Sequence, residues 1–415
     1  MRNHIIKIQA VLFVVMMVFI ISCNKSEENL PTKPVPITLS QNQVSVVESG
    51  NSFAFDIFKE FLKNAGTNEN VILSPLSISS ALSMTLNGAA GATRDSVLRA
   101  LRLTGLTPEA INDSYKSLTE ALLSVDSRVL IKIANSVWTE KNFEVNQAFI
   151  DILKNYYAAE GLSFDINDPS TPDLVNKWIE DNTNGLIKKM LDGLDSNTVM
   201  LLINAIYFKG KWSSQFDASK TVDIPFYRND GSYASVPTMK QEHDFGVYLG
   251  SGFTVAEFPY GQGNFAMDVI LPDSRDGIND FLPSFNAADF AIWTGKLDSQ
   301  KVNLSFPRFK FGYKQDLKDI LTGMGMGIAF VPGIADFSNI SDKYDLYINK
   351  ALHQAFIETN EEGTEAAAAT IIGIGNTSMP QILELKLDHP FIFIIRETTT
   401  NAILFMGRVS DPSVN

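Results

Sequence analysis

The sequence contains a single cysteine, Cys23, among its 415 residues. One cysteine cannot form an intramolecular disulfide, so the chain is not one of the small secreted scaffolds that disulfides stabilise. Hydrophobic residues make up 45% of the chain and charged residues 20%. This composition is typical of a globular protein, and the length is sufficient for one large domain or two ordinary ones.

Histidine is also scarce, and the common enzyme motifs are missing. Of the four histidines, His4 lies in the N-terminal segment, which leaves His243, His353 and His389. None belongs to an HExxH motif, and the chain has neither a GxSxG nucleophile elbow nor a P-loop. The glycines of "GMGMG", residues 323–327, follow a helical pattern, so they predict a helix stop and a turn. The sequence therefore predicts no catalytic residue, no metal and no cofactor.

Positive charge is in the minority. The chain has 34 lysines and arginines against 47 aspartates and glutamates, which gives a formal net charge of −13. Nucleic acids and polyanionic glycans bind to clustered lysine and arginine. The charge balance therefore argues against both as partners, and we interpret the acidity as a source of solubility.

The N-terminus resembles a bacterial lipoprotein signal over residues 1–22. Arg2 and Lys7 precede an apolar run, residues 10–21, that is too short for a stable membrane span. The run leads into Ser22-Cys23, and in lipoproteins a small residue precedes a cysteine that is lipidated before cleavage. We expect Cys23 to be the lipidation site; the alternative is a free thiol close to a signal.

Residues 23–43 are expected to form a flexible tether that is attached to the lipid. This segment is polar and proline-rich, which is typical of a spacer that holds a domain away from a membrane. Glu27 and Glu28 resemble the acidic export tag of surface lipoproteins. The expected location is the bacterial cell envelope, at the outer membrane or the cell surface.

Residues 44–415 are predicted to form a single α+β domain. Apolar residues at helical spacing between Phe53 and Ala65 predict a helix with Ser52 as its cap and Gly66 as its stop, and Ser74-Pro75 predicts the start of another helix. Strands are expected over residues 265–271, 302–306, 391–397 and 402–409. No internal repeat interrupts this organisation.

The stretch "NEEGTEAAAATIIGIG", residues 360–375, combines conflicting preferences. Its four consecutive alanines favour a helix, whereas residues 370–375 favour extended chain. If the segment after Gly363 became a strand, small residues would occupy most of the first positions on both of its faces. Such a strand could enter the middle of an existing sheet. A low-complexity linker or a short helix is the alternative, but it does not explain the preceding Gly-Thr-Glu.

The same stretch resembles the hinge of the reactive-centre loop in inhibitory serpins. Further segments resemble serpin motifs in the family's order, and together they extend over nearly everything from Ser52 to Pro412. They are "NVILSPLSISSALSMTLNGAAGAT", "INAIYFKGKW", "PRFKF", "ADFSNIS", "LHQAF", "HPFIFIIRE" and "ILFMGRV". The resemblance implies a fold of three β-sheets with eight or nine helices and an exposed reactive-centre loop.

The resemblance also implies a function. An inhibitory serpin is a single-use suicide substrate: a protease cleaves the loop, forms an acyl-enzyme and is trapped when the loop inserts into the main sheet. The expected partner is therefore a serine protease, and the chain is expected to be a monomer and not an enzyme. A non-inhibitory serpin that acts as a surface binding protein is the alternative.

Particular residues acquire roles from the family's motifs. Trp212 matches the place where the loop first enters the sheet, and Glu361 is expected to pair with Arg308 near it. The polar cluster under the centre of the opening sheet is matched by Ser74, Ser77, Asn204 and His353. Without the resemblance, Ser74 could be only a helix cap and His353 only a core histidine. The hinge is matched by Glu361, Gly363, Thr364, Glu365, Ala366, Ala367, Ala368 and Ala369.

The scissile bond depends on how the loop is counted. The family's usual hinge length, counted from Glu361, puts the cut between Thr377 and Ser378. Counting back from His389-Pro390 favours Met379, although Pro380 argues against a cut there, and Ile374 is a further alternative. The chain has no lysine or arginine between Lys350 and Lys386. Elastase-like or subtilisin-like proteases are therefore the expected targets, with papain-like cysteine proteases as an alternative, and trypsin-like proteases are not.

Overall fold

The structure is a computed structural model that describes residues 33–363 and 382–414. The chain falls into two units, Met1–Lys33 and Pro34–Asn415. Residues 34–43, which we expected in the tether, therefore belong to the same compact unit as the domain. One reason is a pair of hydrogen bonds: Val35 N donates to Asn264 Oδ1, and Asn264 Nδ2 donates to Val35 O, each at 2.8 Å. The structured region begins earlier than residue 44.

The first described helix, α2 (Gln41–Asn64), also begins earlier than predicted. Ser40 is its N-cap, because the Ser40 hydroxyl accepts from Gln43 N while Gln43 Oε1 accepts from Ser40 N at 2.6 Å. Ser52, the predicted cap, lies inside the helix and donates its hydroxyl to Glu48 O at 2.9 Å. The helix ends at Asn64, and its C-cap Ala65 directly precedes Gly66, the predicted stop.

The described residues contain nine α-helices. Ser74 caps α3 as predicted, with Pro75 at the first helical position. The predicted stop in "GMGMG" is also confirmed, because α10 runs through a short π turn into Gly325, which has a φ of 96°. The helices after α2 are α3 (Pro75–Gly88), α4 (Gly91–Ala100), α5 (Pro108–Ser124), α6 (Gln147–Tyr157), α7 (Thr171–Asn182), α8 (Ile278–Phe281), α9 (Ala287–Thr294) and α10 (Lys318–Leu321).

The strands form three hydrogen-bonded sheets within the described residues. The predicted strands are all present, as parts of β8, β9, β13 and β14. The largest sheet has the order β1 (Val71–Leu73), β14 (Ile403–Val409), β13 (Phe391–Glu397), β8 (Phe265–Pro272), β7 (Phe253–Tyr260), β6 (Tyr233–Leu249), β9 (Asp298–Pro307) and β12 (Leu383–Lys386), and β5 (Val222–Tyr227) pairs with β6. The others are β10 (Phe309–Asp316) with β11 (Leu352–Thr359), and β3 (Glu160–Phe164), β2 (Val129–Glu140) and β4 (Met200–Gly210) in that order.

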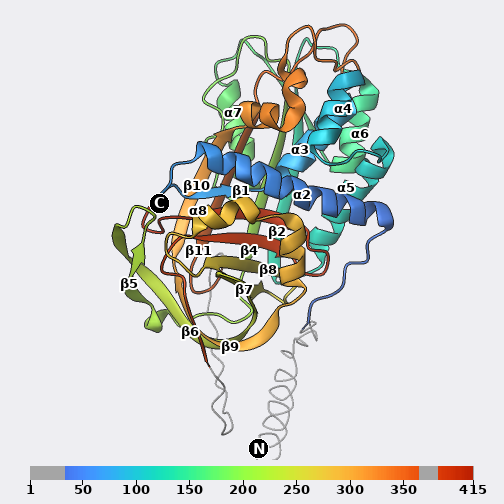
Figure 1. The fold of residues 1–415 in the computed structure, drawn as a ribbon. Coiled ribbons are helices and arrows are strands. Elements are labelled where there is room, and N and C mark those ends of the chain that lie inside the picture. The colour runs from blue at the N-terminus through green and yellow to red at the C-terminus, as the bar shows by residue number, and fades with distance from the viewer. Residues whose placement is uncertain (1–32, 364–381, 415) are drawn as a thin grey trace, which may run out of the picture. The chain divides into compact units, whose positions relative to one another are not determined.

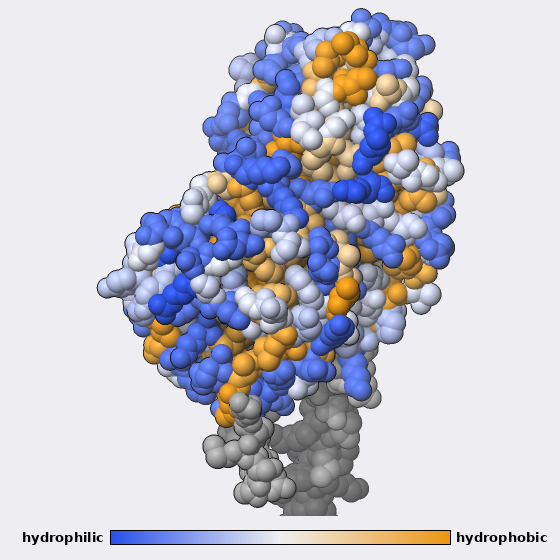
Figure 2. All heavy atoms as spheres, in the orientation of Figure 1, coloured by the Kyte–Doolittle hydropathy of each residue, from blue (hydrophilic) through white to orange (hydrophobic). Residues whose placement is uncertain are grey.

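Helices and sheets are packed against one another around three clusters of buried apolar side chains. Figure 1 shows α2 lying across the unit, with α3 to α6 gathered beside it and the strands β5, β6 and β9 at the opposite end. Every residue of β8, β13 and β14 is buried. The face drawn in Figure 2 is mostly hydrophilic, with small separate apolar patches. None of the helices in the described residues is both long and apolar enough to span a bilayer.

Candidate functional site

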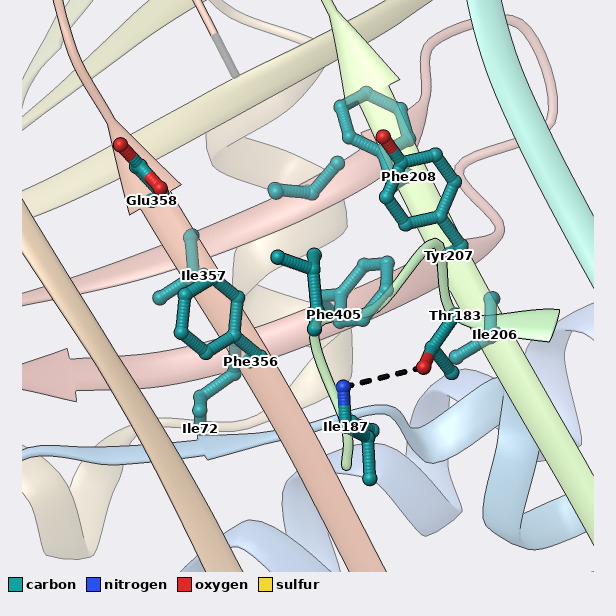
Figure 3. Close-up of a pocket in the computed structure, with 12 residues that line it drawn as sticks. Ile72, Thr183, Ile187, Ile206, Tyr207, Phe208, Phe356, Ile357, Glu358 and Phe405 are labelled. Carbon is teal, nitrogen blue, oxygen red and sulfur yellow. Dashed lines mark hydrogen bonds between the residues drawn. The ribbon is translucent and has the colours of Figure 1, made fainter. Parts of the chain in front are cut away.

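The main discontinuity of the fold is a gap between β4 and β11. In the described structure β4 pairs only with β2, and β11 pairs only with β10, so each of the two strands has one unpaired edge. Figure 3 shows the two strands on either side of a cavity of about 30 Å³. The cavity is lined mainly by apolar side chains, including Ile206 and Phe208 of β4 and Phe356 and Ile357 of β11.

Buried polar atoms without partners lie along both borders of this gap. Asn204 Oδ1 on β4 has no hydrogen-bond partner, and neither do Gln354 Oε1 and Thr359 Oγ1 on β11. An unpaired buried polar group costs free energy, so native structures contain few of them. Their position along one gap indicates a place where further polar groups could be accommodated.

A segment that follows α7 crosses the gap. We call this segment, residues 183–192, the strap. At one end Asn184 Nδ2 donates to Tyr207 Oη of β4 at 3.3 Å, and at the other Asp192 forms an ion pair with Lys314 of β10 at 3.0 Å. The side chain of Ile187 lines the cavity between these ends. The strap therefore connects the two sheets that the gap separates.

Three of the four residues predicted for the polar cluster are in direct contact below β11. Ser74 N donates to His353 Nε2 at 3.0 Å, and the Ser74 hydroxyl accepts from Ser77 N at 3.2 Å and donates to Leu404 O at 2.7 Å. His353 is buried, and burial lowers its pKa to about 3. The imidazole is therefore neutral near pH 7 and acts as an acceptor at Nε2.

Asn204, the fourth predicted residue, lies on the opposite border of the gap. Its Nδ2 donates to Asn135 Oδ1 of the neighbouring strand β2 at 2.6 Å, where the two asparagines are register partners. The structure therefore divides the predicted cluster between the strands that border the gap, with Ser74, Ser77 and His353 on one side and Asn204 on the other.

Trp212 lies at one end of the gap, just after β4. Its indole is 4% exposed and stacks on Tyr260, with ring centroids 4.4 Å apart. The indole Nε1 donates to Asn360 O and the Trp212 main-chain N donates to Glu362 O, both at 2.9 Å. Trp212 therefore holds the main chain just before the predicted hinge glycine, and its role in loop entry stays a prediction.

Glu361 is held by two donors in this region. Arg308 Nε donates to Glu361 Oε1 at 2.8 Å, which confirms the predicted pair, and the Thr221 hydroxyl donates to the same oxygen. Burial would raise the pKa of Glu361, but the hydrogen bonds from Arg308 and Thr221 outweigh it and keep this pKa below its ordinary value. Glu361 is therefore an anion near pH 7.

Gly363 is packed against the end of β4. It has a φ of 126° and forms a β-bridge with Lys211. A Cβ atom at this position would lie 2.7 Å from Lys211 Cα and from Trp212 N, so only glycine fits both the backbone conformation and the space. Gly363 is thus held at the end of the gap.

The remaining predicted residues lie outside the described residues. They are the hinge positions Thr364, Glu365, Ala366, Ala367, Ala368 and Ala369, the candidate scissile positions Thr377 and Ser378 with their alternatives Ile374 and Met379, and the lipidation site Cys23.

Several residues of the site carried no recognisable sequence signal. Thr221 is 140 positions from Glu361, and Asn135 is 69 positions from Asn204. A hydrogen bond over such a separation has no local pattern. His389 lies elsewhere, with Nε2 2.7 Å from Pro272 O. In the described part of the chain, no group of three or more histidine, cysteine or acidic residues could hold a metal ion.

Comparisons with known proteins agree with this geometry. An uncharacterised serpin-like protein of Thermococcus kodakarensis is 34% identical and aligns with 93% of this chain and 90% of its own. The crystal structure of a thermophilic serpin, Tengpin, in the native state superimposes with a TM-score of 0.81 at 30% identity, over 91% of this chain and 97% of that one. Human thyroxine-binding globulin complexed with thyroxine superimposes with a TM-score of 0.81 at 26% identity, over 89% and 99%.

The family model described as serpin, serine protease inhibitor, matches residues 48–412. The described sheets and helices are those of the serpin fold, as predicted. This chain therefore belongs to the serpin family.

Proposed function

We propose that this serpin is a single-use protease inhibitor that traps its target as a covalent acyl-enzyme. The observation that supports this most directly is the gap between β4 and β11, with Gly363 packed at its end. A strand that continued from Gly363 would find an unpaired edge on each side and buried polar atoms without partners. Serpins in general act on proteases, and the covalent trap is our proposal for this chain.

The proposed reaction has two stages. The protease nucleophile attacks the carbonyl carbon of the scissile bond, the new amino terminus leaves, and the protease remains attached as an ester to the N-terminal part of the loop. This part then inserts between β4 and β11 and carries the protease with it. About ten new ladder hydrogen bonds at about 1 kcal/mol each would supply roughly 10 kcal/mol. Distortion of the protease active site would prevent deacylation.

The strap must leave the gap for a strand to enter it. Its ion pair between Asp192 and Lys314 is exposed, with side-chain exposures of 71% and 35%, and exposed pairs contribute about 0–1 kcal/mol. The ion pair to β10 can therefore break at small cost, whereas the buried side chain of Ile187 must also leave the cavity.

The target class follows from the sequence of the loop. With no lysine or arginine between Lys350 and Lys386, a trypsin-like protease would find no basic residue to bind. We propose elastase-like or subtilisin-like serine proteases as targets, with cleavage between Thr377 and Ser378. Papain-like cysteine proteases are a second candidate class.

A non-inhibitory binding protein is the alternative function within the same fold. It is suggested by thyroxine-binding globulin, whose structure contains thyroxine. Apart from Glu365, the residues from Gly363 to Ala369 are small. They favour the inhibitor, because a hinge that inserts must pass between two packed strands without burying bulky or charged groups, and the alternation of a strand would put Glu365 on the face opposite to Thr364.

We also propose that the protein is exported and anchored by a lipid on Cys23 to the bacterial cell envelope, at the outer membrane or the cell surface. The observation behind this proposal is the signal-like sequence of residues 1–22. Cys23→Ala should abolish labelling by a fatty-acid analogue and release the protein from the membrane fraction. Labelling that persists in this variant would contradict the proposal.

The inhibitor proposal is tested by incubating the chain without its signal with pancreatic elastase, subtilisin and trypsin. We expect an SDS-resistant band of summed mass with elastase or subtilisin and none with trypsin. Mass spectrometry of the released C-terminal peptide identifies the cut. Cleavage of the loop without a covalent complex would favour the binding protein.

A further inference from the structure

A series of buried and partly buried hydrogen bonds leads from β4 to helix α3. On β4, Asn204 Nδ2 donates to Asn135 Oδ1 of β2 at 2.6 Å. Asn135 Nδ2 then donates to the main-chain oxygen of Tyr157, the last residue of α6, at 2.7 Å. The Tyr157 hydroxyl donates to Asn112 Oδ1 of α5 at 2.8 Å. Asn112 in turn exchanges two hydrogen bonds with Asn87 of α3, at 2.9 and 3.0 Å.

We call this series of hydrogen bonds the Tyr157 network. Among its members, only Tyr157 takes part through both its backbone and its side chain. The backbone oxygen contacts the sheet and the hydroxyl contacts the helices. The residue is 5% exposed, and burial raises the pKa of its hydroxyl well above the ordinary value, so the group remains a donor. Removal of the hydroxyl would interrupt this series of hydrogen bonds between Tyr157 and Asn112 and leave its other links intact.

The other border of the gap is connected to the same helix. On β11, His353 accepts from the main-chain N of Ser74, which is the N-cap of α3. Helix α3 also packs directly against β4. The two strands that have no ladder between them are therefore both connected to α3, one through Ser74 at its start and the other through Asn87 at its last turn.

We propose that the Tyr157 network controls how readily the gap between β4 and β11 opens, with Tyr157 as a positioning residue that couples β4 to α3. The proposal rests on the proposed function in one respect, because opening matters biologically only if a strand enters. Its physical content does not depend on a protease, since opening of the sheet can be measured in the protein alone.

Several buried groups must separate together when the gap opens. Asn135, Tyr157 and Asn112 are buried, so none of them can exchange a lost partner for water without local opening. A movement of β4 away from β11 therefore pulls on α6, α5 and α3 in turn. In Tyr157→Phe, Asn112 Oδ1 keeps its hydrogen bond from Asn87, so the variant is expected to fold.

The test is hydrogen exchange, measured by mass spectrometry on the full chain without protease. Tyr157→Phe should raise the exchange rate of peptides from both β4 and β11 about fivefold, the change expected from the loss of one buried hydrogen bond. Peptides from β14 should not change. Tyr115→Phe is the matched control, because its ring centroid is 6.0 Å from that of Tyr157 and its hydroxyl interacts with Ser79 and Ser83 of α3 instead of linking α6 to Asn112.

Faster exchange in β4 and β11 that is specific to Tyr157→Phe supports the proposal. Equal effects of Tyr157→Phe and Tyr115→Phe, or faster exchange confined to α6, would overturn it. If Tyr157→Phe does not fold, Asn87→Ala interrupts the network at a half-buried position, and unchanged exchange in β4 would then overturn it. A chain that fails to trap any protease but shows this coupling would contradict the proposed function and leave the Tyr157 network supported.

Discussion

The nine-stranded sheet and the gap between β4 and β11 contain buried polar groups of opposite kinds. In the sheet, Arg396 is 2% exposed, donates to Asp268 Oδ2 at 2.7 Å and also pairs with Glu257. The guanidinium of Arg396 and the carboxyl groups of Asp268 and Glu257 thus lie together among β7, β8 and β13, with Glu257 partly exposed. Between the ends of the gap the groups are neutral: Ser74 forms three hydrogen bonds, one of them to His353, and Asn204 donates to Asn135, whereas Asn204 Oδ1 has no partner.

This difference has a physical consequence. A charged group that loses its partners in the interior costs several kcal/mol, whereas a neutral hydrogen bond contributes about 1 kcal/mol. A sheet that encloses Arg396 must stay closed, because any opening would separate buried charges. A gap bordered by neutral groups can open and close again at small cost. The location of charge therefore distinguishes the rigid part of the fold from the part that we propose to be mobile.

The largest expected effect is on the sheet. Arg396→Leu leaves the carboxylates of Asp268 and Glu257 buried without their cation, which should cost about 3–5 kcal/mol and lower the midpoint of urea unfolding strongly. Arg102→Leu is the control, because the pair of Arg102 with Asp56 is exposed and should contribute about 0–1 kcal/mol. Similar midpoints for the two variants would show that buried charge does not make the sheet rigid.

The next effect concerns the strand that we propose to enter the gap. In Thr364→Arg, insertion would bury a charge without a partner, at a cost of several kcal/mol. The variant should be cleaved at the same bond and at a similar rate but release active protease. Glu365→Arg, on the other face of the inserted strand, should do much less harm. A Thr364→Arg variant that still forms the SDS-resistant complex would mean that this residue does not enter the sheet.

The two regions should also respond oppositely to pH. Burial and the nearby Asp268 raise the pKa of Glu257 from 4.5 to about 7, against the opposing effect of Arg396. The folded state therefore holds a proton that the unfolded state has lost between pH 4.5 and 7, so the sheet loses stability as pH rises, by up to about 3 kcal/mol. In Glu257→Gln, the midpoint of urea unfolding should change less with pH between 4.5 and 7 than it does in the unmodified protein.

The gap is expected to show the reverse trend. Burial lowers the pKa of His353 from 6.5 to about 3, so below pH 6.5 the unfolded state binds a proton that the folded state excludes, and stability falls with acidity. His353→Gln should remove this loss and leave the effect of Glu257 unchanged. If Glu257→Gln and His353→Gln change the pH dependence of the urea midpoint in the same direction, the two regions do not respond oppositely to pH.

The sequence was informative wherever the signal was local. The strand patterns of residues 265–271 and 391–397, the cap at Ser74 and the stop at Gly325 each depend on neighbours in the chain, and the structure contains all four. The predicted start of α2 was wrong, because Ser52 and Ser40 are the same type of residue and serve equally well as N-caps. Only the Gln43 side chain, which completes the capping box, favours Ser40.

The site was predictable only in part. Family motifs indicated Trp212 and the pair of Arg308 with Glu361, and both contacts are present. They gave no indication that Asn204 would bond to Asn135 rather than to residues below β11. The buried charges of the sheet were not predicted either, because Arg396 and Asp268 are 128 positions apart. Pairs of this kind depend on the tertiary fold, which no local period encodes.

The smallest expected effect separates a helix cap from a component of the gap. Ser74 and Thr107 cap α3 and α5 with the same geometry: each hydroxyl accepts from the main-chain N three residues later at 3.2 Å, and each precedes a proline. Either change to alanine should cost about 1 kcal/mol in cap energy. Ser74→Ala also removes the donor to Leu404 O. It should therefore speed the spontaneous conversion of the intact protein, on gentle heating, to a form that resists urea, whereas Thr107→Ala should only lower the urea midpoint. If the two variants convert at the same rate, Ser74 is a helix cap and nothing more, and the neutral groups of the gap do not limit its opening.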